Sequence, residues 1–335
     1  MISGSRHSML SSGRMTDTDT ARKRIDEFIA PFRVKPGSKV TLAHDFDPAF
    51  KAGIEKKKRG VELLETGVQM LAEYQARLAA QDTYGVLVVL QAMDAAGKDG
   101  TIRHVMSGVN PQGVAVHSFK VPSAEELDHD FLWRYAQRLP SRGEIGIFNR
   151  SHYEEVLVVR VHPENLDRQK LPKDTRDDIW QRRYRAINDW EHYLCENGFR
   201  VVKIFLNLSK EEQRRRLLRR IDLPSHNWKF SAADLKERAR WDDYQKAISR
   251  CLSHTSTEWA PWWVIPADRK WFARIGAAAV LVHTLMDIDP QFPAVDDEQR
   301  TSLLEVKAQL EAEAPDGAAP DPFEEEQKPA ETAAS

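Results

Sequence analysis

The sequence of 335 residues predicts an α/β fold in which helices cover both faces of a mainly parallel sheet, a three-layer sandwich. Two observations support this prediction: short apolar runs recur along the chain, and charged stretches of helical spacing separate them. Continuous β-branched runs are typical of strands buried on both faces, and strands that alternate with helices favour parallel pairing. The predicted strands are residues 85–90, 114–116, 145–148, 201–206 and 262–265.

Helices are predicted between these strands. From residue 54 to residue 80, apolar side chains recur at three- and four-residue steps, which places them on one face of a long helix. The other predicted helices are residues 124–138, 174–196, 210–220 and 271–286. Ser209 precedes the third of these, and Glu212 follows it three residues later, which is the pattern of a capping box.

Composition divides the chain into three segments. Residues 1–40 are predicted to be a flexible leader, because the first residues are rich in Ser, Thr and charge and no signal-peptide apolar region follows them. Residues 41–290 form the predicted catalytic domain. Residues 291–335 form a predicted acidic tail, mostly disordered apart from one short helix at 302–313, because Ala, Pro and Glu dominate it.

The formal net charge of -2 conceals an uneven distribution. Residues 295–335 hold 12 acidic and 3 basic side chains, a balance of -9, which leaves 46 basic and 39 acidic side chains, or +7, in residues 1–294. The body of the protein is therefore basic and able to bind a polyanion. A mean hydropathy of -0.56 and the absence of an apolar run near the roughly 18 residues of a membrane helix argue against a membrane protein.

The segment after the first predicted strand has the features of a phosphate-binding loop. Small residues let backbone N–H groups turn toward an anion, and Gly97 and Lys98 stand at the start of the next helix. Ala92 replaces the first glycine of the G-x-x-x-x-G-K-[ST] pattern, Asp99 replaces its hydroxyl residue, and Thr101 is a candidate to supply that hydroxyl. The predicted phosphate-binding residues of the loop are Ala95, Ala96, Gly97, Asp99, Gly100 and Thr101.

Asp94 lies inside this loop. A carboxylate among phosphates is repelled unless a cation intervenes, so Asp94 is predicted to bind Mg²⁺ directly or through water. The alternative is an aspartate that caps the loop by accepting hydrogen bonds from backbone amides.

A second polar motif begins where the third predicted strand ends. Phosphate-loop enzymes usually carry an acidic Mg²⁺ partner there, whereas this chain has Asn149, which brings no charge. Arg150 is predicted to clamp an anion. The alternative for Arg150 is a structural ion pair with Glu154 or Glu155, and His152 is predicted to pack or to form hydrogen bonds.

Arginines crowd on the predicted helix that precedes the last strand. Arg216, Arg219 and Arg220 share one face of it and are predicted to contact phosphate. Arg214 and Arg215 are predicted to be solvated. The helical pattern then breaks and resumes, and a helical pair at this position is where nucleotide kinases carry a lid.

These motifs together resemble the polyphosphate kinase type 2 family. The likeness spans residues 45–290 in the expected order and is much more specific than any single motif. It rests on residues 92–102, 107–113, 118–122, 148–157, 219–224, 228–231, 241–244 and 261–268. The form Asn-Arg-Ser-His-Tyr-Glu at 149–154 resembles the branch that accepts both AMP and ADP.

The resemblance implies a thymidylate-kinase-like P-loop kinase fold with a helical lid at about residues 212–250. It implies Mg²⁺-dependent transfer of the terminal phosphoryl group of inorganic polyphosphate to a nucleotide. By motif position, Asp94 and Lys98 hold metal and phosphate, and Arg216 and Arg220 are the lid arginines. The residues implied to be catalytic are Asp94, Lys98, Asn149, Arg150 and Glu154.

The expected partners follow from this activity. Mg²⁺ is the expected cofactor, with Mn²⁺ as the alternative ion, and the nucleotides are AMP, ADP and ATP, with guanine nucleotides as alternatives. Lys120 and Lys229 are expected to bind polyphosphate, and Lys56, Lys57 and Lys58 either extend this track or are solvated. Nucleic acid and membrane are not expected partners, and a cytoplasmic homo-oligomer, either a dimer or a tetramer, is expected.

The expected chemistry needs positioning more than proton transfer. The terminal phosphate oxygen of a nucleotide is already ionised near neutral pH, so catalysis reduces to aligning two polyanions and screening their repulsion. An ATP-dependent nucleoside monophosphate kinase on the same fold is the alternative enzyme. A nucleic-acid-binding module is a third candidate, although no RNA- or DNA-binding signature is present.

Overall fold

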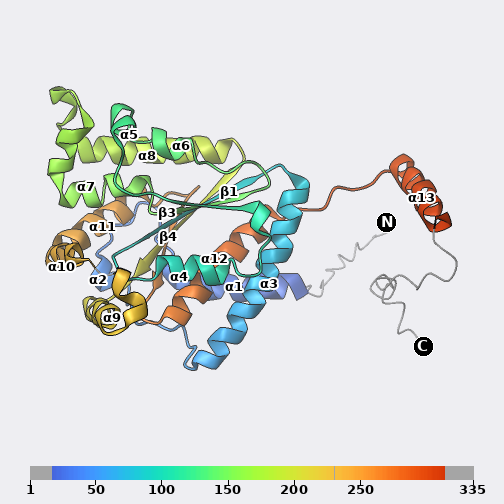
Figure 1. The fold of residues 1–335 in the computed structure, drawn as a ribbon, viewed down its shortest axis with the longest axis horizontal. Coiled ribbons are helices and arrows are strands. Elements are labelled where there is room, and N and C mark those ends of the chain that lie inside the picture. Colours follow the sequence, from blue (N-terminus) through green and yellow to red (C-terminus); the bar gives the residue numbers. More distant parts are fainter. Residues whose placement is uncertain (1–16, 230, 314–335) are drawn as a thin grey trace, which may run out of the picture. The chain divides into compact units, whose positions relative to one another are not determined.

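A parallel sheet in the order β2-β3-β1-β4-β5 forms the centre of the fold in the computed structural model, which describes residues 17–229 and 231–313 (Figure 1). The strands are β1 Gly85–Ala92, β2 Val114–Ser118, β3 Ile145–Asn149, β4 Phe199–Asn207 and β5 Trp262–Pro266. All four neighbouring pairs are parallel. The predicted strands and the parallel sheet are confirmed, and β4 extends beyond its apolar run at both ends.

Helices fill the connections between these strands. They are α1 Asp17–Ile29, α2 Leu42–Asp45, α3 Lys57–Gln81, α4 Lys98–Val105, α5 Ala124–Asp128, α6 Trp133–Ala136, α7 Val158–Val161, α8 Ile179–Glu196, α9 Lys210–Asp222, α10 Ala232–Ala239, α11 Trp241–Thr255, α12 Lys270–Ile288 and α13 Asp297–Ala312. Short 3₁₀ helices are η1 Ala30–Phe32, η2 Pro111–Gly113, η3 His152–Glu155, η4 Pro163–Gln169, η5 Lys173–Thr175 and η6 Pro224–Lys229. The helix predicted at 124–138 is two short helices, because the Asp130 carboxylate accepts a hydrogen bond from the Leu132 N–H and turns the chain.

The sheet separates two hydrophobic cores. Val86, Val88 and Leu90 of β1 join the core beneath α1, α3 and α12, whereas Leu87 and Val89 join the core beneath α8 and α11. This alternation is the two-residue period of a strand that is buried on both faces. The predicted three-layer sandwich is therefore confirmed, with the two helical layers on opposite sides of the sheet (Figure 1).

The expected flexible leader of residues 1–40 is wrong for residues 17–40, which pack against both cores: Ile29 and Phe32 belong to the first, and Val34 and Val40 belong to the second. Ile29 and Phe32 are each 1% exposed, and the Val34 N–H donates to the Trp262 carbonyl at 2.9 Å. Apolar residues of helical spacing occur in this segment, and a composition averaged over the first residues does not show them. Residues 1–16 lie outside the described part of the chain.

The C-terminal segment forms a second compact unit, residues 293–335, after the first unit at 1–292. Within it, α13 begins at a complete capping box formed by Asp296 and Gln299. The helix predicted at 302–313 therefore exists and starts earlier than expected. The disorder predicted beyond it falls on residues 314–335, outside the described residues.

Helix α12 is the one helix among residues 17–229 and 231–313 that is long and apolar enough to cross a membrane by length and composition. Most of its side chains are instead buried in the first core, between α3 and the sheet. Its apolar character is therefore accounted for by packing within the protein. The close approach of α12 to β5 requires a glycine, because a Cβ at Gly276 would lie 2.6 Å from the Cγ2 of Ile265.

We expect Gly276→Ala to lower the free energy of unfolding by about 1–3 kcal/mol, because the added methyl overlaps a rigid strand side chain. Gly67→Ala on α3 is the matched control, since its Cβ would meet the Cβ of Ala278 at an ordinary 3.6 Å. That control is expected to be neutral or stabilising by up to about 1 kcal/mol through helix propensity. Urea unfolding followed by circular dichroism measures both, and equal effects would contradict the tight contact between α12 and β5.

Candidate functional site

The site is built on the loop of residues 93–97, which joins the carboxyl end of β1 to α4. Gly97 adopts φ +105° at the N-cap of α4, a conformation that favours glycine, and Ala95 also has a positive φ of 65°. These two reversals turn the loop so that α4 begins at Lys98 with its amino end at the sheet edge. The structure therefore gives the predicted strand–loop–helix geometry of a phosphate-binding loop.

Lys98 lies at the centre of a cluster of charged groups. Its ammonium group donates to the Ala92 carbonyl at 3.1 Å. Burial lowers the pKa of Lys98, and the nearby carboxylate of Asp94 partly offsets this effect. The charge of Arg150 also lowers the pKa of Lys98, and the charge of Glu154 raises it. The structure therefore brings together four of the five residues expected to be catalytic. A bound phosphate at this position would add further stabilisation to the ammonium form.

Arg150 reaches this cluster from the end of β3. Its Nη2 atom lies 3.4 Å from the Oδ1 atom of Asp94, and both side chains are partly exposed. The alternative pairing of Arg150 with Glu155 is wrong, because Glu155 is buried against Arg183, with its Oε2 atom 3.1 Å from Nη1. The exposed guanidinium of Arg150 therefore faces the mouth of the loop, where an anion would bind.

Asn149, the fifth expected catalytic residue, contacts the loop through Asp99. Its amide nitrogen donates to the Asp99 carboxylate at 2.8 Å and lies 3.4 Å from the Ser118 hydroxyl of β2. Asp99 departs from the phosphate-loop pattern, and its hydrogen bond with Asn149 gives it a role in joining the loop to the end of β3. An aspartate at position 149 would face a second carboxylate, so the asparagine and Asp99 fit each other.

Glu154 is held close to the loop by a glutamine that the sequence analysis did not identify. Burial raises the pKa of Glu154, whereas Arg150, Lys98 and a hydrogen bond with Gln91 lower it. Gln91, at the end of β1, also donates to the Ser151 hydroxyl at 3.1 Å. A buried polar residue at the end of an otherwise apolar strand was the available signal for Gln91.

Arg216 does not serve as the expected free phosphate ligand. Its Nη1 atom donates to the Ala96 carbonyl at 2.7 Å, its Nη2 atom donates to the Ala267 carbonyl at 2.6 Å, and its Nε atom donates to Glu212 at 2.9 Å. Weaker contacts reach the carbonyls of Ala95 and Asp268, so all five N–H donors have partners inside the protein. Arg216 therefore links the loop by hydrogen bonds to the segment that follows β5.

The other expected basic residues differ in exposure. Arg220 lies 3.3 Å from Asp234 and links α9 to α10, whereas Arg219 is exposed. Lys120 is also exposed, and the side chain of Lys229 lies outside the described residues. The lid expected at 212–250 extends too far, because α11 supplies buried side chains such as Tyr244 and Ile248 to the second core.

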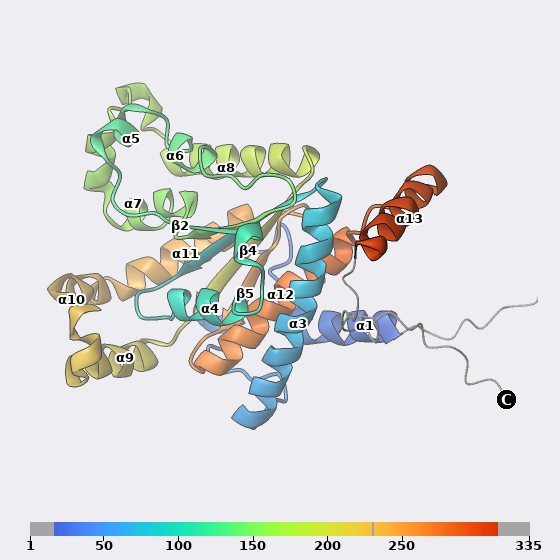
Figure 2. The same cartoon turned by 45° about the vertical axis from the view of Figure 1, so that its right-hand side comes forward.

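A row of four cations lies on α9, α12 and α4, three helices that Figure 2 shows near one another. Arg103, Lys270 and Arg274 were not identified by the sequence analysis, whereas Arg219 was predicted to contact phosphate. Burial and the positive charges of Arg216, Arg219 and Arg274 lower the pKa of Lys270. Burial and Arg103 lower the pKa of Arg274. Within the described part of the chain, no ion pair involves the members of this basic row, Arg103, Arg219, Lys270 and Arg274.

A pocket of about 330 Å³ opens between α5, η4 and α8. Its wall combines apolar residues such as Phe131 and Ile179 with the buried arginines Arg134 and Arg183. The pocket also includes Glu155 of η3, the same short helix that carries Glu154. It is therefore attached directly to the turn that follows β3.

Among residues 17–229 and 231–313, no group of three or more His, Cys, Asp and Glu side chains is arranged to hold a metal ion. The Asp94 carboxylate is partly exposed at the mouth of the loop, and its contact with Arg150 is long. Mg²⁺ commonly binds one or two carboxylates and takes its remaining ligands from water and substrate phosphates. Asp94 therefore fits a metal ion that enters together with phosphate.

The fold and this site define a phosphotransferase of the P-loop kinase class. Residues 54–293 match the family model described as Polyphosphate kinase 2 (PPK2). The chain belongs to the polyphosphate kinase 2 family, as its motifs indicated.

Its relatives carry consistent names. The chain is 50% identical over 284 residues to the ADP-polyphosphate phosphotransferase of Rhodopseudomonas palustris, covering 83% of this chain and 97% of that one. It is 45% identical over 278 residues to the AMP/ADP-polyphosphate phosphotransferase of Meiothermus ruber, covering 82% and 99%. The crystal structure of polyphosphate kinase 2 from Arthrobacter aurescens matches with a TM-score of 0.73 at 41% identity, covering 82% of this chain and 98% of that chain.

We expect Arg216→Lys to destabilise the protein even without substrate, by about 1–3 kcal/mol, because a lysine leaves buried carbonyls of the loop and of the β5–α12 segment unpaired. The exposed neighbour Arg219→Lys is the matched control and should keep the unfolding midpoint of the parent protein. Thermal unfolding in the absence of phosphate measures both. An unchanged midpoint for Arg216→Lys would show that its contacts do not support the loop.

Proposed function

We propose that this protein transfers the terminal phosphoryl group of inorganic polyphosphate to AMP and ADP. The observation that carries the proposal is the convergence of Lys98, Asp94 and Arg150 at the mouth of a phosphate-binding loop. One ammonium, one guanidinium and one carboxylate suit a reaction between two polyanions, because the two cations neutralise phosphate oxygens and the carboxylate can hold a metal ion.

The division of labour within the site follows from its geometry. Lys98 and the backbone N–H groups at the start of α4 bind the phosphoryl group that is transferred. Arg150 neutralises charge that develops on its oxygens, and Asn149 fixes the side chain of Asp99. Direct in-line transfer then requires the acceptor phosphate to approach from the side opposite the leaving chain.

The proposed cofactor is Mg²⁺, held through Asp94. Held by Asp94, a divalent ion would supply positive charge that screens the repulsion between donor and acceptor phosphates. Mn²⁺ is the alternative ion, since it accepts the same carboxylate and phosphate oxygens.

The basic row of Arg103, Arg219, Lys270 and Arg274 supports polyphosphate as the donor. Unpaired cations repel one another, and the lowered pKa values of Lys270 and Arg274 reflect this repulsion together with burial. A linear polyanion that lies along the row would relieve it.

The pocket beside η3 supports a nucleotide as the acceptor. Its volume and its mixture of an aromatic ring with charged groups suit a purine nucleoside, and it adjoins the turn that carries Arg150 and Glu154. The relatives are named for AMP, ADP and, in a Pseudomonas aeruginosa protein, GDP. We propose AMP and ADP for this chain because the two relatives named above share the largest part of its length.

An ATP-dependent nucleoside monophosphate kinase is not favoured, because the relatives' names give polyphosphate as the donor. We also propose that the protein is cytoplasmic, which the two free thiols of Cys195 and Cys251 support. A homo-oligomer is proposed as well, and the exposed edge strand β2 with Val116 offers it a contact surface.

The proposal predicts that purified enzyme with Mg²⁺ forms ADP from AMP and ATP from ADP when polyphosphate is the sole donor. Chelation with EDTA should abolish both reactions, and added Mg²⁺ should restore them. Lys98→Ala should lower kcat on the order of 100- to 1000-fold while the protein stays folded, because it removes one charge partner of the transferring group. Arg214→Ala, an exposed arginine paired with Glu211, is the control. Transfer from ATP but not from polyphosphate would overturn the proposal.

The basic row generates a prediction of its own. Lys270→Glu should raise the KM for long-chain polyphosphate about fivefold with little change in kcat, because one charge contact is worth on the order of 1 kcal/mol and lies away from the reacting atoms. The dependence of KM on salt should also become weaker. Arg77→Glu, near the end of α3 and paired with Glu73, is the control charge reversal. An unchanged KM for Lys270→Glu would exclude the row from the donor path.

A further inference from the structure

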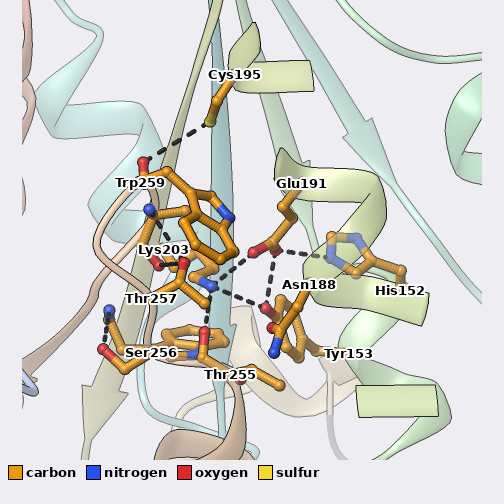
Figure 3. Close-up of polar contacts among 12 residues, drawn as sticks. His152, Tyr153, Asn188, Glu191, Cys195, Lys203, Thr255, Ser256, Thr257 and Trp259 are labelled. Carbon is orange, nitrogen blue, oxygen red and sulfur yellow. Dashed lines mark hydrogen bonds and ion pairs between the residues drawn. The ribbon is translucent and has the colours of Figure 1, made fainter. Parts of the chain in front are cut away.

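A lysine lies in the middle of strand β4, in the cluster of polar side chains shown in Figure 3. Lys203 of β4 is 0% exposed, and its ammonium group donates to Glu191 at 2.6 Å, to the Tyr153 hydroxyl at 3.0 Å and to the Thr255 carbonyl at 2.5 Å. Glu191 of α8 is also 0% exposed. The three donors of the ammonium group therefore have partners, as a buried charge requires.

The carboxylate of Glu191 connects this lysine to η3. Its Oε1 atom accepts a hydrogen bond from the Tyr153 hydroxyl at 2.8 Å and lies 3.2 Å from Nε2 of His152. The ammonium group of Lys203 lowers the pKa of Glu191 against the opposing effect of burial, so the carboxylate stays charged. One buried ion pair thus holds two consecutive side chains of η3.

The same turn carries the charged groups of the site. His152 and Tyr153 follow Arg150 by two and three residues, and Glu154 comes next in the chain. Ser151, which is 0% exposed, accepts hydrogen bonds from Gln91 at 3.1 Å and from the Tyr153 N–H at 3.2 Å. Every residue from 151 to 153 is therefore anchored by a hydrogen bond to buried groups.

Arg150 has a backbone conformation that needs such anchoring. Its φ of +65° is uncommon for a residue with a side chain, and conformations of this kind persist only where the surrounding structure holds them. The Arg150 N–H donates to the Leu90 carbonyl at 3.2 Å, which fixes one end of the turn. The other end is fixed through His152 and Tyr153.

We propose that Glu191 and Lys203 are positioning residues, which hold the turn of residues 150–155 through Tyr153 so that the Arg150 guanidinium stays at the mouth of the phosphate-binding loop. An apolar side chain would fill position 203 of the strand without the desolvation of a charge, so the ion pair serves geometry more than stability. Glu191 and Lys203 touch no reacting atom. This inference rests on the proposed function only in the experiments that measure turnover.

Tyr153→Phe tests the link with the smallest change. It removes one hydroxyl group and leaves the direct contact between Lys203 and Glu191, so the protein should stay folded. We expect kcat to fall about tenfold while the KM for polyphosphate changes less than twofold, because displacement of Arg150 affects the transition state more than binding. Hydrogen exchange of the amides at 150–156 should become faster.

Leu194→Ala is the control for a purely structural effect. Leu194 lies on α8 three residues beyond Glu191 and is 3% exposed, so the variant leaves a cavity and should lower the unfolding midpoint. Its kcat should match the parent value. If Leu194→Ala and Tyr153→Phe reduced kcat in proportion to their loss of stability, the positioning role would be overturned.

A double variant, Lys203→Met with Glu191→Leu, removes the ion pair without leaving a buried unpaired charge, and such replacements usually fold. It should reproduce the kcat loss of Tyr153→Phe. In the Arg150→Lys background, Tyr153→Phe should have a smaller effect than in the parent, since the planar guanidinium it positions is already gone. Full additivity of the two substitutions would contradict a link through Arg150.

Failure of the proposed function and failure of this inference give different results. A parent protein without polyphosphate-dependent transfer would refute the function, and hydrogen exchange at 150–156 would still test the anchoring. An active parent with unchanged kcat and unchanged exchange in both Tyr153→Phe and the double variant would refute the positioning role alone.

Discussion

The contacts of the Arg216 guanidinium join the segments on which the site depends. One side chain binds carbonyl oxygens of the phosphate-binding loop and of the segment after β5, and it also reaches Glu212 on its own helix. Half of the predicted capping box forms, because the Ser209 hydroxyl accepts a hydrogen bond from the Glu212 N–H at 3.1 Å. The Glu212 carboxylate pairs with Arg216 instead of the Ser209 N–H, which donates to the Asp268 carboxylate at 2.8 Å. The loop, α9 and the segment before α12 are consequently linked by hydrogen bonds that involve no ligand.

The basic side chains of this protein fall into two groups with different roles, which differ in burial and in ion pairing. Buried cations such as Arg216 and Lys203 are satisfied by carbonyls and carboxylates within the fold. Lys270 is exposed and Arg274 is half-buried, and neither forms an ion pair among the described residues, so their mutual repulsion favours an anion. The positions of the charges, rather than their sum, therefore support the proposal that a polyphosphate chain approaches the protein along the basic row.

Local patterns in the sequence were sufficient to predict the strands and the loop, because both depend on neighbours in the chain. The strand order β2-β3-β1-β4-β5 was not predicted, because it joins strands that are distant in the sequence. Periodicity correctly placed Arg216 and Arg219 near one face of α9, but only the fold shows that one is enclosed by carbonyls and the other is exposed. Lys203 was counted as part of the predicted strand at 201–206, and its role was missed for the same reason. Its partners come from α8 and η3, which are distant in the sequence. Residues that act through distant partners are the ones that a single sequence conceals.

The contacts at the mouth of the loop explain how charged substrates can enter it together. Lys98 binds the Ala92 carbonyl and Arg150 lies beside Asp94, so each charge of the site has a partner in the protein itself. The Asp94–Arg150 contact is long and partly exposed, and such pairs contribute only about 0–1 kcal/mol. A phosphate can therefore pair with Arg150, and a metal ion can bind Asp94, with little loss of interaction energy from the Asp94–Arg150 pair. Either exchange alone would leave an unpaired charge in the site, which favours the arrival of the polyanion with its metal ion as one unit.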